Sequence, residues 1–129
     1  MLNVNPETVC RLIQLARAFH AKEGVVIPEE PTSPSDDWAR QTLADHAGDQ
    51  TFHEFESIIN DLEPDQQQEV VALLWIARGD FEKSEWRAAL AEATDSWNEY
   101  TAHYLIAHPM LADYLNEGLN LFDYSCEST

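Results

Sequence analysis

The residues with the clearest chemical potential are polar side chains placed beside long apolar runs. Arg78 and Asp80 follow eight consecutive apolar residues, 70–77, and Asp113 and Tyr114 lie in a second apolar stretch near the end of the chain. A charge beside a core is costly unless it is paired. We therefore predict that Arg78 contacts Asp80 or Asp113 and locks two helices together. The alternative is that these four residues form a ligand site.

Sequence patterns for metal binding and catalysis are missing. Segment 79–85 resembles the second half of a calcium-binding EF-hand loop, but the preceding ligand positions hold two apolar residues and an arginine. The five histidines lack the spacings of zinc sites, and there is no phosphate loop or nucleophile elbow. Glu54 and Glu56 diverge on a helix and fit a solvated face better than an acid/base pair. The sequence predicts no catalytic residue, metal or cofactor, and favours a protein that is not an enzyme.

The elements that must position these residues are predicted to be helices. Apolar residues recur at helical spacing, and the alternation of a half-exposed strand is absent. Asn5 and Pro6 are typical of a helix start and Gly24 of a helix end. The proline-rich segment 24–35 is expected to be a flexible loop. Further helices are expected from about 35 to Gly48, from about Thr51 to Pro64, and from Pro109 to Gly118.

The apolar run 70–77 belongs to the helix predicted at the centre of the fold. Pro64 suits its first turn, Gly79 its end, and Asp65 and Glu69 complement its dipole. A buried parallel strand gives a similar run, but the polar lead-in extends this one to about four helical turns. Because the helix is apolar on nearly every face, other helices must surround it.

The next segment, 84–107, contains no glycine or proline, so one long helix and two helices with a bend both fit. Its apolar ridge is predicted to face the core and consists of Trp86, Leu90, Ala93 and Trp97. The elements together predict an all-α fold, an orthogonal bundle of about five to seven helices around a central helix at 64–78. We expect a single domain over residues 1–129 with a frayed tail at 123–129.

The charge of the chain is strongly negative, −17 at pH 7, and unevenly distributed. There is no Lys or Arg between Gln41 and Ala77, and none after Arg87. Direct binding to nucleic acid draws on clustered cations and is therefore disfavoured. Such charge supports solubility and attraction to a basic partner. The region of the first helix is the exception, with Arg11, Arg17 and Lys22.

The two cysteines, Cys10 and Cys126, lie near opposite ends of the chain without metal-like spacing. The simplest interpretation is two reduced thiols in a reducing compartment, and a disulfide between them is the alternative. The first residues lack the basic and apolar regions of a signal peptide, and the run 70–77 is too short to span a bilayer. A cytoplasmic location without membrane attachment is therefore expected.

Two separated motifs carry a family resemblance. Residues 65–81 read DQQQEVVALLWIARGDF, and residues 109–119 read PMLADYLNEGL. The pair resembles a bacterial domain-of-unknown-function family of small helical proteins, with an acidic, glutamine-containing lead-in, then LVALxWxGRGD, then LLADYLEEGL. The resemblance covers about residues 35–120 and departs at Ala77 and Asn116, where the family pattern has Gly and Glu. It implies a helical fold and no particular activity.

Two classes of function fit these observations. The first is a non-enzymatic interaction module whose acidic faces bind a basic partner protein, with nucleic-acid mimicry as a sharper variant that needs carboxylates spaced like phosphates. The second is a small-molecule binder or enzyme with a pocket between the aromatic-rich helices. That pocket would be lined by Arg78, His103, Tyr104 or Asp113. A closed core around these residues would remove the second class.

Overall fold

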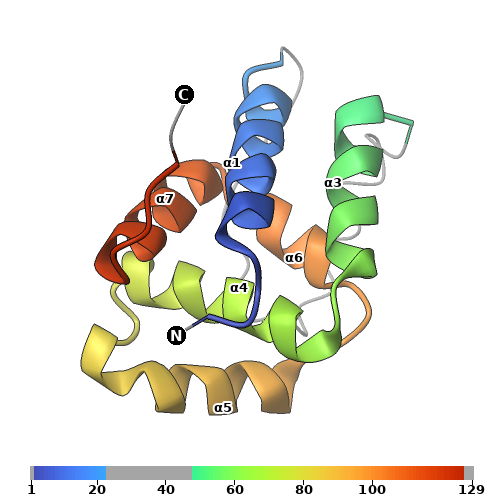
Figure 1. Cartoon of the computed structure of the whole chain (residues 1–129). Coiled ribbons are helices and arrows are strands. Elements are labelled where there is room, and N and C mark those ends of the chain that lie inside the picture. Colours follow the sequence, from blue (N-terminus) through green and yellow to red (C-terminus); the bar gives the residue numbers. More distant parts are fainter. Residues whose placement is uncertain (1, 23–47, 127–129) are drawn as a thin grey trace.

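The computed structural model describes residues 2–22 and 48–126 (Figure 1). These residues form six α-helices and a short 3-10 helix, and they contain no strand, which confirms the all-α prediction. The loop expected at 24–35 and the helix expected before Gly48 lie outside the described residues. The helices are α1 (Pro6–His20), α3 (Gln50–Asp61), α4 (Pro64–Arg78), η2 (Lys83–Glu85), α5 (Trp86–Ser96), α6 (Thr101–Ile106) and α7 (Leu111–Leu121).

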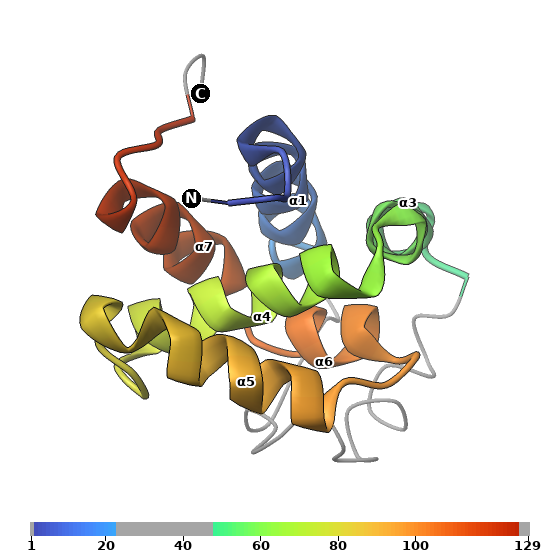
Figure 2. The same cartoon turned by 60° about the horizontal axis from the view of Figure 1, so that its bottom comes forward.

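Helix α4 is the central element, as its sequence predicts. It has α5 along one side and α7 against another, while α1 packs on α3 and α7 (Figures 1 and 2). Every residue from Val70 to Ile76 is buried, because helices cover the apolar run on all its faces. None of the described helices is both long and apolar enough to cross a membrane.

The ends of α4 follow from local chemistry. Pro64 occupies its first turn, where the missing N–H costs nothing. Gly79 ends the helix with φ at 96°, a left-handed conformation that L side chains rarely adopt. The N–H groups of Gly79 and Asp80 donate to the carbonyl of Trp75 at 3.1 and 2.9 Å. The chain therefore turns sharply at the residue where the apolar run meets polar sequence.

Helix α7 continues past the glycine that was expected to end it. It begins at Leu111, two residues after Pro109, and runs to Leu121, with Gly118 buried inside it. A Cβ atom at Gly118 would lie 3.0 Å from the carbonyl oxygen of Leu73 and 3.2 Å from its Cβ. The prediction was wrong because this glycine serves close packing of α7 on α4, rather than a turn.

The segment 84–107 forms two helices, α5 and α6, separated by a short connection. In that connection the side chain of Asn98 accepts from the N–H of Tyr100 at 2.8 Å, and its carbonyl accepts from the hydroxyl of Thr101 at 3.0 Å. The predicted core ridge of α5 is wrong at Trp97, which is 39% exposed. Since α5 ends at Ser96 and Trp97 has extended backbone, its side chain leaves the helical face.

A buried carboxylate anchors the segment before α1. Glu69 is 4% exposed, and its oxygens accept from the N–H of Asn3 at 2.9 and 3.0 Å and of Val4 at 2.7 Å. We expected this residue only to complement the helix dipole. Because its partners are backbone groups more than sixty residues away, no local pattern indicates the contact.

Candidate functional site

The predicted polar cluster is divided between two places. Arg78 bonds Asp80 Oδ2 through Nε at 2.8 Å and through Nη2 at 2.5 Å. Asp113 instead lies 3.4 Å from Arg17 of α1, in an exposed pair. Tyr114 is partly buried against the main core. The structure therefore joins two of the four residues and places the other two on α7, where they contact other parts of the molecule.

Arg78 also contacts a buried histidine that the sequence did not single out. Its Nη1 lies 2.8 Å from Nε2 of His108, which is 0% exposed. A guanidinium can only donate, so Nε2 accepts and Nδ1 carries the proton. That proton is shared with the carbonyls of Tyr104 at 2.9 Å and Leu105 at 3.2 Å. The imidazole is therefore held neutral in one tautomer.

The pKa values in this network follow from burial. Burial and the positive charge of Arg78 lower the pKa of His108 to about 4, against the opposing effect of its two carbonyl partners. Burial likewise raises the pKa of the Tyr104 phenol, whose oxygen accepts from the indole N–H of Trp75 at 2.8 Å. All these groups satisfy one another inside the protein, which indicates a structural lock between α4 and α6.

Two surface clefts are formed by other residues. Neither is lined by Arg78, His103, Tyr104 or Asp113, the residues expected around a small-molecule pocket. Tyr104 is 2% exposed, within the core. Among the described residues, no three His, Cys, Asp or Glu side chains are grouped so that they could hold a metal ion.

The first cleft lies where the corner between α3 and α4 meets the connection between α5 and α6, which lie side by side in Figures 1 and 2. Its volume is about 510 Å³. Aromatic rings and carboxylates share this space. The lining residues are Glu56, Asn60, Leu62, Pro64, Gln67, Trp97, Glu99 and Tyr100. We call it the acidic aromatic cleft.

The buried side chain of Gln67 fixes the geometry of this cleft. It is 6% exposed, and its amide nitrogen donates to the carbonyls of Ile59 at 3.0 Å and Leu62 at 3.1 Å. Its amide oxygen accepts from the indole N–H of Trp97 at 2.8 Å. One buried side chain thus ties the end of α3 and the start of α4 to the exposed tryptophan, so that the ring is oriented without a ligand.

The carboxylates of the cleft have no Lys or Arg of the described residues beside them. Among the described residues, neither Glu56 nor Glu99 forms an ion pair with Lys or Arg. Glu56 lies between two imidazoles, 3.9 Å from Nδ1 of His53 and 3.7 Å from Nδ1 of His103. The sequence predicts a solvated face for Glu56, which is partly exposed. Helical periodicity does not reveal Trp97 as a surface residue, because its exposure depends on where α5 ends.

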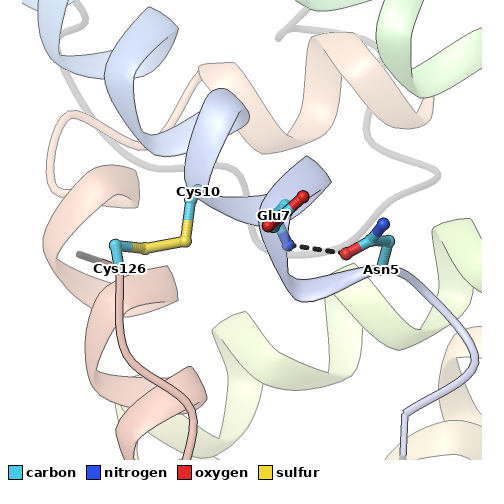
Figure 3. The surroundings of a disulfide bond; sticks show 4 residues. All are labelled: Asn5, Glu7, Cys10 and Cys126. Carbon is cyan, nitrogen blue, oxygen red and sulfur yellow. Dashed lines mark hydrogen bonds between the residues drawn. A yellow bond between two sulfur atoms is a disulfide. The ribbon is translucent and has the colours of Figure 1, made fainter. Parts of the chain in front are cut away.

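The second cleft runs along α1 and contains a disulfide. Cys10 of α1 is bonded to Cys126 after α7 (Figure 3), so the expectation of two reduced thiols is wrong. The cysteines are 116 residues apart, and only the packing of α1 on α7 brings their Cα atoms to 5.7 Å. The tail was expected to fray from residue 123. Residues 123–126 are described and are held by the disulfide, and residues 127–129 lie outside the described residues.

The cleft along α1 has a volume of about 940 Å³. Nearby, the N-cap Asn5 accepts from the N–H of Glu7 at 2.9 Å, as expected for the start of α1 (Figure 3). The walls of this cleft come from one stripe of α1, from α7 and from the segment after α7. The lining residues are Pro6, Glu7, Cys10, Arg11, Ile13, Gln14, Arg17, Asn116, Ser125 and Cys126.

Over the described residues, the chain is a small all-α protein in which helices pack around an apolar core, with these two clefts at its surface. The model of the family "Protein of unknown function (DUF3775)" matches residues 52–124, more than half of the chain, and the chain belongs to this family. No curated protein and no solved structure matches the sequence. The acidic aromatic cleft lies within the matched residues, whereas Cys10 and Cys126 lie outside them.

Proposed function

We propose that this protein is a non-enzymatic interaction module that binds a basic partner protein through the acidic aromatic cleft. One observation carries the proposal: Trp97 and Tyr100 line the same cleft as Glu56 and Glu99, two carboxylates that pair with no Lys or Arg of the described residues. The ligand is a Lys or Arg side chain on the surface of the partner.

The chemistry of the cleft suits a cationic side chain. The face of an indole or phenol ring attracts ammonium and guanidinium groups, and a carboxylate adds a charge-assisted hydrogen bond. The methylene groups of Lys and Arg pack well on aromatic rings while the charged end stays polar. Since Gln67 holds Trp97 in place, little conformational entropy is lost on binding.

The surrounding charge supports the same ligand. Every lining residue comes from one of two stretches without Lys or Arg, 41–77 and 88–129. Together with the net charge of −17, this field draws a basic partner towards the cleft and repels an acidic one. Association should therefore be fast at low ionic strength and weaken as salt is added.

The test uses a fluorescent peptide rich in Lys and Arg, with binding followed by anisotropy at low and moderate salt. Trp97→Leu should weaken binding by about fivefold, the size of a cation–π contact, and Glu99→Gln by a similar factor. Glu117→Gln is the matched control, because it removes one exposed negative charge from α7, outside the cleft. A peptide with acetylated lysines in place of the cations should not bind.

The outcomes separate the site from the function. Equal losses for Glu99→Gln and Glu117→Gln would show that the overall charge, not the cleft, binds the peptide. That pattern is expected of a nucleic-acid mimic, which should then displace DNA from a basic DNA-binding protein. Absence of binding at both salt concentrations would reject the interaction module and favour the alternative of a small-molecule binder.

A further inference from the structure

The Cys10–Cys126 disulfide is part of a cleft wall rather than of the core. Both half-cystines are only partly buried, and both line the cleft along α1. Thiolates break a disulfide by direct attack on a sulfur atom, so access decides whether the bond can be reduced in the folded protein. Here the cleft provides that access.

The disulfide holds the end of the described chain against α1. After α7 the chain turns at Asp123, which has φ at 67°, and the N–H of Tyr124 bonds the carbonyl of Leu119 at 3.0 Å. Ser125 and Cys126 make no hydrogen bond within the described residues. The S–S bond is therefore the connection that keeps this part of the cleft wall in place.

The charges of the cleft favour a thiolate. Arg11 and Arg17 line it with Glu7 in a molecule that is otherwise strongly acidic. Their side chains are 48% and 50% exposed, so their pairs with Glu54 and Asp113 are open to solvent. Nearby guanidinium groups attract an approaching thiolate and stabilise a departing one. Cys10, on the same helix as both arginines, is therefore the better leaving group.

We propose that Cys10–Cys126 is a reversible redox switch, reduced by a dithiol that enters the cleft along α1. One thiolate of the dithiol attacks Sγ of Cys126, forms a mixed disulfide and releases Cys10 as a thiolate. The second thiol of the dithiol then attacks the reagent's own sulfur in the mixed disulfide and releases Cys126 as a thiolate. The reagent leaves as an intramolecular disulfide. Two electrons and two protons pass from the dithiol to the two cysteines.

Reduction opens one side of the cleft and leaves the fold in place. Ser125 and Cys126 become free to leave α1 with their part of the cleft wall, while Phe122 stays packed on Trp86. The packing of α1 on α3 and α7 persists, because these helices meet through buried apolar residues. Oxidised and reduced forms thus present different surfaces.

The test treats the full chain with dithiothreitol at about pH 7 without denaturant, and traps free thiols for mass measurement. Hydrogen exchange is followed in parallel. Reduction should proceed in the folded protein, and exchange at the Tyr124 amide, which precedes the released residues, should accelerate about tenfold while 70–76 is unchanged. A disulfide that is reduced only in denaturant, or a tail whose exchange does not change on reduction, would overturn the proposal.

Two variants test the separate steps. Arg11→Gln should slow reduction by about two- to fivefold at low ionic strength, whereas Arg87→Gln, with the same charge change on α5, should not. Equal rates for both variants would exclude a role for the cleft charges. Cys126→Ser should show rapid exchange at the Tyr124 amide without any reductant. A protected tail in this variant would show that other contacts hold it.

Discussion

The guanidinium of Arg78 and the imidazole of His108 lie 2.8 Å apart, Nη1 to Nε2, where the end of α4 meets the chain after α6. A positive group beside a buried histidine excludes a second positive charge there. The contact therefore exists only with a neutral imidazole, and its other nitrogen is committed to the carbonyl of Tyr104. The junction should be sensitive to acid.

We predict that His108 makes the folded protein less stable as the pH falls below neutrality. Its pKa is about 4 in the folded protein and 6.5 ordinarily, so between these values the unfolded chain binds a proton that the folded chain does not. Stability from this source is complete above 6.5 and decreases towards 4. The loss between pH 7 and pH 5 should be about 2 kcal/mol in urea unfolding.

The carboxylates of the protein also titrate in acid. The contribution of His108 is therefore found by comparing the wild type with a variant that lacks this histidine. The His108→Gln protein should be less stable than the wild type at pH 7. Its free energy of unfolding should fall less between pH 7 and pH 5 than that of the wild type. The control is His53→Gln, which changes an exposed histidine. If wild type and His108→Gln show parallel pH dependence, the histidine is not the source.

Gly118→Ala should destabilise the protein. Alanine is the better helix former by about 1 kcal/mol, but its Cβ would meet the backbone oxygen of Leu73 at 3.0 Å, in the buried central helix. Since that backbone has little room to move, we expect a net loss of about 1 to 3 kcal/mol, measured by thermal or urea unfolding. Asn120→Ala, exposed on the same helix, should be neutral or stabilising. A more stable Gly118→Ala protein would contradict the close packing.

Glu69→Gln should loosen the segment before α1. Oε1 of the carboxylate accepts from the N–H groups of both Asn3 and Val4, and Oε2 shares that of Asn3. An amide carries no charge and would turn its NH2 group, a donor, towards the N–H of Asn3. We expect a loss of about 2 kcal/mol and faster hydrogen exchange at both amides. Glu117→Gln provides the control for the change in charge. Unchanged exchange at Val4 would show that Glu69 does not anchor the segment.

Added salt should stabilise the protein. A net charge of −17 on a chain of 129 residues produces self-repulsion, and screening shortens its range to about 8 Å at physiological ionic strength. The melting temperature should rise by several degrees when NaCl is increased from low to moderate concentration, and potassium chloride should act alike. A flat or falling response would indicate that local ion pairs already compensate the acids.

The fate of Trp97 shows the limit of sequence periodicity. Trp86, Leu90, Ala93 and Trp97 share a helical face only while the helix continues, and α5 ends at Ser96. The exposed ring then became part of the acidic aromatic cleft, together with Glu56 from a distant helix. A hydrophobic pattern predicts burial well inside an element but not across its boundary, because one change in backbone dihedral redirects the side chain.

The sequence alone determined the all-α class and the helix at the centre of the fold. The apolar run 70–77 with its polar lead-in, between Pro64 and Gly79, favours a helix covered by others, because its apolar character and its end signals are local properties of the chain. Tertiary structure alone decided the Cys10–Cys126 bond, the neutral His108 beside Arg78, and the union of Glu56 with Trp97 in one cleft. Each of these pairs residues far apart in sequence, and only the packing of whole helices sets the distance between them.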